Sequence, residues 1–106
     1  MRRNLQGDEN HTITLGRDFA ELIPRFLENR HRELAYLRKA LAEGEYGELQ
    51  QLGHRMRGAG STYGFDRVSA LGGRIEAGAC AKDPEALAAA IAEYADHLGR
   101  LKVTYE

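Results

Sequence analysis

The residues best suited to chemistry in this chain of 106 residues lie between Leu52 and Phe65. There, His54 is followed by Arg57 three residues later. A neutral imidazole near pH 7 is a competent nucleophile toward phosphorus, and a guanidinium one helical turn away can stabilise the incoming negative charge. The same two residues fit a solvated surface histidine beside an arginine equally well. Geometry alone therefore leaves both interpretations open.

Helical spacing places His54 on the polar side of this segment. At about 100° per residue, one face collects the apolar residues Leu49, Leu52, Met56, Ala59 and Tyr63. His54 projects from roughly the opposite face, so we expect it to be exposed. Its neighbours on that outer face are polar or small, namely Gln50, Gln51, Arg57, Gly58 and Ser61. We expect a macromolecular partner to dock there, with Gly58 leaving the approach along the helix open.

Two helices are expected in the first part of the chain to position this site. The first covers about residues 23–43, with Pro24 in its first turn, where proline is tolerated. An apolar stripe starts in a looser turn before this helix and continues along it, through Phe19, Ile23, Phe26, Leu27, Leu34, Leu37 and Leu41. The second covers about residues 45–63 and is closed by Gly64.

Two further helices are expected after the site. The third covers about residues 67–81, with Asp66 as its N-cap, and the fourth begins at Pro84, with Asp83 as its N-cap. The third contains Gly72, Gly73 and Gly78. Each glycine lowers helix propensity by up to about 1 kcal/mol, so close packing against a neighbouring helix should hold this element. The fourth carries the bundle-type seam Leu87, Ile91, Tyr94, Leu98, Leu101 and Tyr105.

Four helices with short connections predict an all-α, antiparallel up-and-down four-helix bundle. We assign it to residues 16–106, as one domain. Residues 1–15 are expected to form a flexible N-terminal tail and a lead-in, in which the alternation from His11 to Leu15 suggests a short extended stretch.

Composition excludes some classes of partner and indicates where in the cell the protein is located. Hydrophobic residues make up 42% and charged residues 29%, and the formal net charge is −1. Lys and Arg are spread along the chain, which argues against nucleic acid or a membrane as a partner. The lone Cys80 cannot form an internal disulfide, and the N-terminus has no apolar stretch of signal-peptide length. We therefore expect a cytoplasmic protein, with Cys80 buried as a small hydrophobe.

The run from His54 to Ser61 resembles the signature of histidine-containing phosphotransfer (HPt) domains. In that family a phosphoacceptor histidine is followed by Lys or Arg at +3, Gly at +4 and small residues beyond. Further stretches, covering residues 24–27, 63–65 and 71–76, are similar to the same family's pattern. The resemblance covers about residues 19–105. One departure is that the family more often has lysine where Arg57 stands, and the two cations bind phosphate differently in detail.

The resemblance implies a histidine phosphotransfer protein of a two-component phosphorelay. His54 would accept a phosphoryl group from a receiver-domain aspartate and pass it to another receiver, Arg57 would stabilise the charge, and Gly58 would belong to the docking surface. Such a domain is not an ATP-dependent kinase, and the sequence has no glycine-rich phosphate loop. We expect no cofactor, and we expect a monomer. The alternative is a non-phosphorylated HPt-like module that only docks a receiver or kinase.

Metal binding is the remaining alternative, because four-helix bundles also hold di-iron centres. Glu28 and His31 match the Glu-x-x-His spacing of such sites, but this is a single copy and Glu28 lies off the apolar stripe. His11 and His97 have no metal-ligand partner at useful spacing. We therefore expect no metal site, and we expect both of these histidines to be solvated or to lie at the rim.

Overall fold

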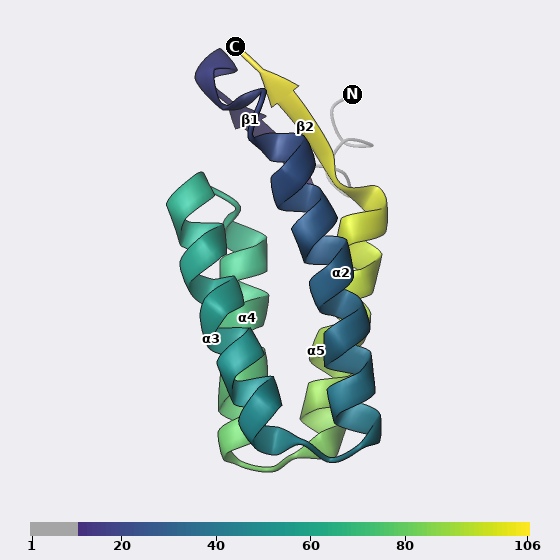
Figure 1. Cartoon of the computed structure of the whole chain (residues 1–106). Coiled ribbons are helices and arrows are strands. Elements are labelled where there is room, and N and C mark those ends of the chain that lie inside the picture. Colours follow the sequence, from purple (N-terminus) through teal and green to yellow (C-terminus); the bar gives the residue numbers. More distant parts are fainter. Residues whose placement is uncertain (1–10) are drawn as a thin grey trace, which may run out of the picture.

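Four long helices make up most of the structure, a computed structural model that describes residues 11–106 (Figure 1). They are α2 (Ile23–Ala42), α3 (Tyr46–Tyr63), α4 (Asp66–Cys80) and α5 (Pro84–Arg100). Each predicted helix boundary agrees with the structure to within two residues, so the mostly helical fold is confirmed. The connections α2–α3 and α4–α5 lie at one end of the molecule, and α3–α4 lies at the other. The expected flexible tail, residues 1–10, lies outside the described residues.

Local sequence signals explain two of the helix ends. Gly64 has a φ of 79°, a left-handed conformation that glycine adopts without strain, and it ends α3 as expected. The Asp83 carboxylate accepts a hydrogen bond from the backbone N–H of Ala86 at 3.1 Å, which caps α5. The N-cap predicted at Asp66 is wrong. Asp66 is already helical, because Phe65 turns into the core, where its ring packs 4.5 Å from that of Phe26.

A two-stranded parallel sheet joins the beginning and the end of the described chain. The strands are β1 (Thr12–Leu15) and β2 (Lys102–Tyr105), paired in register with Ile13 opposite Val103. The expected extended lead-in is thus confirmed, but an all-α description omits this sheet. Placing Tyr105 on the helical seam was wrong, because α5 ends at Arg100. The β2 residues Val103, Thr104 and Tyr105 are β-branched or aromatic, and they pair with β1.

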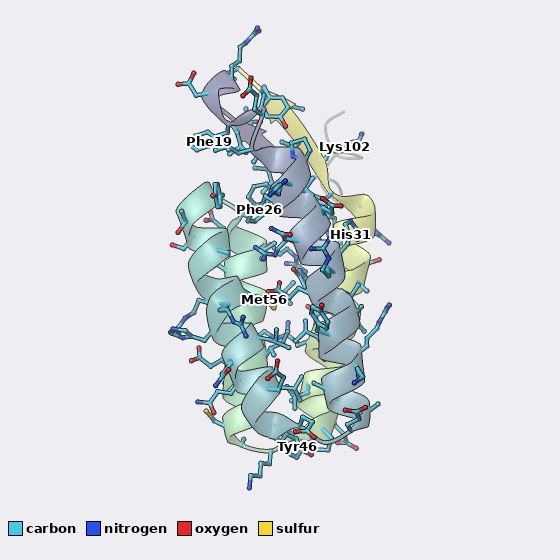
Figure 2. All side chains as sticks on the ribbon, viewed as in Figure 1. Phe19, Phe26, His31, Tyr46, Met56 and Lys102 are labelled. Atoms are coloured by element: carbon cyan, nitrogen blue, oxygen red, sulfur yellow. The ribbon has the colours of Figure 1, made fainter. Side chains whose placement is uncertain are left out.

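The core lies between the four helices along their apolar faces. Figure 2 shows Phe26 and Met56 in this interior. The predicted apolar-face residues that are buried include Ile23, Phe26, Leu34, Leu37, Leu49, Leu52, Met56, Val68, Leu71, Ile75, Leu87, Ile91, Tyr94 and Leu98. Two side chains depart from expectation. Phe19 lies in the short 3-10 helix Arg17–Phe19 and is 38% exposed, and Cys80 is exposed because Ala79 beside it takes the core position.

The pair α3 and α4 contacts more extensively than any other pair of helices. Glycine permits this approach. A Cβ atom on Gly53 would lie 2.6 Å from the backbone nitrogen of Glu76, and one on Gly72 would lie 2.6 Å from that of Arg57. Neither position has room for a side chain. The expectation that close packing holds the glycine-rich third helix is confirmed at Gly72.

A pair of buried histidines links β1 to the last turn of α5. His11 and His97 are 7% and 0% exposed, so the expectation that both are solvated is wrong. Strand pairing explains it, because the backbone N–H of Lys102 donates to the carbonyl of His11 and holds that residue beside α5. The two Nδ1 atoms are 2.8 Å apart, so one imidazole donates and the other accepts.

This arrangement disfavours a charged His97. Burial, together with smaller effects of His11 and Arg67, lowers the pKa of His97 to about 4, against the weaker opposing effect of Asp96. Protonating both imidazoles would point two N–H groups at each other. The Nε2 atom of His97 also has no hydrogen-bond partner among the described residues.

We predict that His97 makes the domain less stable as the pH falls from about 6.5 toward 4. The unfolded chain binds a proton on this imidazole near pH 6.5, whereas the folded chain resists until about pH 4. Stability is therefore present above pH 6.5 and decreases on acidification, by at most about 1.4 kcal/mol per pH unit. Urea unfolding at several pH values measures it.

His97→Phe serves as the comparison for that measurement, because it removes the titrating group and keeps a ring of similar size. Burial raises the pKa of Glu33, which gives a slope of the opposite sign in both proteins. The informative quantity is thus the difference between the two pH profiles. Identical profiles would show that His97 does not resist protonation in the fold.

Candidate functional site

His54 lies near the middle of α3 and faces solvent. Its side chain is 66% exposed, which confirms the predicted exposure. Leu52 and Met56 on the opposite face of the same helix are buried and fix how α3 is rotated about its axis. The histidine therefore stands on a rigid element and points outward, where another macromolecule can reach it.

Glu76 of α4 contacts both side chains predicted to react, those of His54 and Arg57. Nδ1 of His54 lies 3.1 Å from Oε2 of this carboxylate, and Nη2 of Arg57 lies 3.5 Å from Oε1. The Glu76 side chain is only 22% exposed, whereas that of Arg57 is 53% exposed. One carboxylate of α4 thus bridges the imidazole and the guanidinium of α3.

The sequence analysis did not assign Glu76 to the site. The signal that could have found it is Gly72, one helical turn earlier on the same face of α4. A glycine there indicates that this face lies close to another helix, and Gly53 directly before His54 has the same meaning on α3. Together the two glycines place the Glu76 side chain at the level of His54.

The His54–Glu76 hydrogen bond determines which ring nitrogen can react. A carboxylate accepts, so Nδ1–H of His54 donates to it, and Nε2 then carries the free lone pair. The carboxylate also stabilises the positive charge that the ring acquires when Nε2 attacks an electrophile. The arrangement can therefore support an exposed nitrogen nucleophile with a fixed orientation.

The residues predicted to dock a partner fall into two groups. Gln50 and Gln51 line an open depression beside His54, together with Gly47, Arg55 and Glu76. Gly58 and Ser61 are exposed further along α3 and do not line this depression. A Cβ atom on Gly58 would meet nothing within 4 Å, so the surface beyond His54 is unobstructed.

Residues 11–106 contain no group of three or more His, Cys, Asp or Glu side chains that could hold a metal ion. His31 lies on α2 and is exposed (Figure 2), and Glu28 pairs with Arg32 at 3.8 Å. Nor does any described helix have the length and apolar character needed to cross a membrane.

We predict that Glu76→Ala changes the tautomer of His54. In the wild type the hydrogen bond favours a proton on Nδ1, and without the carboxylate the ring should shift toward the Nε2–H form that an unpaired histidine side chain prefers. The ¹⁵N chemical shifts of the His54 ring, recorded at a pH where it is neutral, distinguish the two forms. Unchanged shifts in the variant would mean that the hydrogen bond does not form in solution.

Comparison with known proteins identifies the family to which this chain belongs. Residues 21–102 match the family model described as Hpt domain, which covers most of the chain. No curated protein and no solved structure gave a significant match. The matched range includes all four helices up to the first residue of β2, and with them His54, Arg57 and Glu76. The chain therefore belongs to the Hpt domain family.

Proposed function

We propose that this protein is a histidine phosphotransfer protein of a two-component phosphorelay. His54 accepts a phosphoryl group from the aspartate of one receiver domain and passes it to another receiver. The observation that carries this proposal is the exposed imidazole whose Nδ1 is bound to Glu76, with Arg57 beside it. Hpt domains take part in phosphorelay signalling, where they interact with receiver domains and act as phosphotransfer modules rather than ATP-dependent kinases.

The transfer step follows from the orientation of the ring. The Nε2 lone pair of His54 forms a bond to phosphorus while the bond from phosphorus to the receiver's carboxylate oxygen breaks, and its electron pair leaves with that carboxylate. The imidazole ring becomes positively charged, and Glu76 stabilises it at Nδ1–H. In the reverse direction another receiver's aspartate attacks the phosphorus, and Nε2 recovers its lone pair.

Arg57 supplies the charge that faces the phosphoryl oxygens. It is held 3.5 Å from Glu76, and its side chain is half exposed, so it can turn toward an incoming phosphoryl group without unfolding α3. A guanidinium offers several N–H donors to phosphate oxygens. In this proposal Gln50, Gln51, Gly58 and Ser61 form the surface that meets the receiver.

The proposal also covers the arrangement of the helices, the oligomeric state, the location and the partners. The four helices form an antiparallel up-and-down bundle over residues 16–106, after a tail and lead-in over residues 1–15. The protein acts as a monomer in the cytoplasm, without a cofactor, and its partners are receiver domains of response regulators or hybrid sensor kinases rather than nucleic acid or membrane.

A non-phosphorylated docking module is the second candidate. It would need the exposed surface but not the fixed tautomer. The Glu76 contact favours phosphotransfer over docking alone, because a carboxylate that orients the imidazole serves a reacting nitrogen.

We predict that His54→Gln abolishes phosphoryl acceptance and leaves the fold and receiver binding largely intact. The side chain points away from the core, so little packing is lost. Incubation with a phosphorylated receiver, followed by detection of acid-labile, base-stable phosphate, measures acceptance, and calorimetry measures binding. Wild-type protein that binds the receiver but gains no such phosphate would support the docking module instead.

A second substitution tests the docking surface. Gly58→Leu should slow acceptance from the receiver by obstructing its approach, while the isolated bundle gains up to about 1 kcal/mol of stability, because leucine is the better helix former. A Cβ at this position meets nothing within 4 Å, so the fold accommodates it. Gly99→Leu on α5, where a Cβ also meets nothing, is the matched control. A normal rate in Gly58→Leu would contradict the assigned docking face.

A further inference from the structure

We propose that Gly53 is a positioning residue for the reacting histidine. Its missing side chain lets the backbone of α4 lie against α3, so that the Glu76 carboxylate reaches Nδ1 of His54. The consequence for phosphotransfer rests on the proposed function, whereas the effect on the orientation of His54 does not.

Two of the three atoms nearest to a Cβ on Gly53, including the nearest, belong to Glu76. Such a Cβ would lie 2.6 Å from its backbone nitrogen, 3.1 Å from its Cα and 2.7 Å from the carbonyl oxygen of Gly72. All three are backbone atoms, so no flexible side chain can move aside. The residue directly before the nucleophile therefore contacts the main chain of the residue that orients the nucleophile.

The distances show why this contact matters. Bringing a Cβ at position 53 from 2.6 Å to an ordinary contact of at least 3.4 Å requires α4 to move away locally by roughly 0.8 Å. The His54–Glu76 hydrogen bond is already 3.1 Å long, near the upper end of the usual range. The same carboxylate also pairs with Arg57, which limits how far it can turn to compensate. A small shift of α4 at this level is thus enough to break the bond.

Gly60 provides a matched control on the same helix. A Cβ there would lie 2.5 Å from the backbone nitrogen of Ser69 and 2.8 Å from the carbonyl oxygen of Phe65. The steric conflict with α4 is as severe as at Gly53, but it falls at the far end of α4 from Glu76. Gly60→Ala therefore loosens the same helix pair without acting directly on His54.

The experiment compares Gly53→Ala with Gly60→Ala. Both variants should lose stability in urea unfolding. Only Gly53→Ala should shift the ¹⁵N resonances of His54 toward those of Glu76→Ala, and only it should slow acceptance from the receiver, by about 2- to 10-fold, the range expected for one lost hydrogen bond. The double variant Gly53→Ala/Glu76→Ala should be no slower than Glu76→Ala alone.

Three outcomes would overturn the proposal. His54 resonances unchanged in Gly53→Ala would show that Glu76 still reaches the ring, and equal shifts in both variants would show a general loosening. The variants are also made together with Gly99→Ala, which raises helix propensity on α5 at a position where a Cβ meets nothing. If Gly53→Ala does not fold in the Gly99→Ala background while Gly60→Ala folds in the same background, Gly53 serves the fold and not the site.

The two proposals fail in distinguishable ways. A wild-type protein that never accepts phosphate contradicts the phosphotransfer function, but the ¹⁵N comparison still decides whether Gly53 positions His54. Conversely, normal phosphotransfer with unchanged resonances in Gly53→Ala removes only the positioning role.

Discussion

The contact between α3 and α4, in which backbone meets backbone without intervening side chains, is the constraint on which the site depends. Gly53 and Gly72 face each other across it, and their missing Cβ atoms bring the two main chains together. The glycines carry a cost in helix propensity, which the close packing must offset. In return, a carboxylate on one helix reaches an imidazole on the next. Stability and site geometry therefore rest on the same few positions.

The remaining helices keep this pair in place. α2 and α5 supply the apolar residues that cover the inner faces of α3 and α4, so His54 and Arg57 remain on the outside. At the end of the bundle the β1–β2 pair and the His11–His97 hydrogen bond join the chain's first described segment to the last turn of α5. These contacts lie away from His54, so acidification acts on this end of the fold through His97.

The sequence predicted the features that local signals determine. Asp83 with Pro84 fixes where α5 begins, Gly64 fixes where α3 ends, and periodicity alone put His54 on the exposed face. Features that depend on distant residues were missed. Residues 101–105 fit a helical seam as well as a strand, and only pairing with β1, some 90 positions away, decides between them. Glu76 was missed for the same reason, because its partner lies on another helix.

The openness of the site bears on how the proposed chemistry would be divided between this protein and a receiver domain. His54 and Arg57 are both more than half exposed, so water screens their charges, and an exposed ion pair contributes little. The orientation of the ring does not depend on this screening, because a hydrogen bond from Nδ1–H of His54 to the half-buried Glu76 carboxylate fixes the tautomer before any partner arrives. In the proposed phosphotransfer, the guanidinium would become effective once a docked receiver excluded water from around it, since electrostatic stabilisation grows as the local dielectric falls. Under the proposed function, the free protein would thus keep its nucleophile aligned but only weakly assisted, and docking on α3 would complete the site.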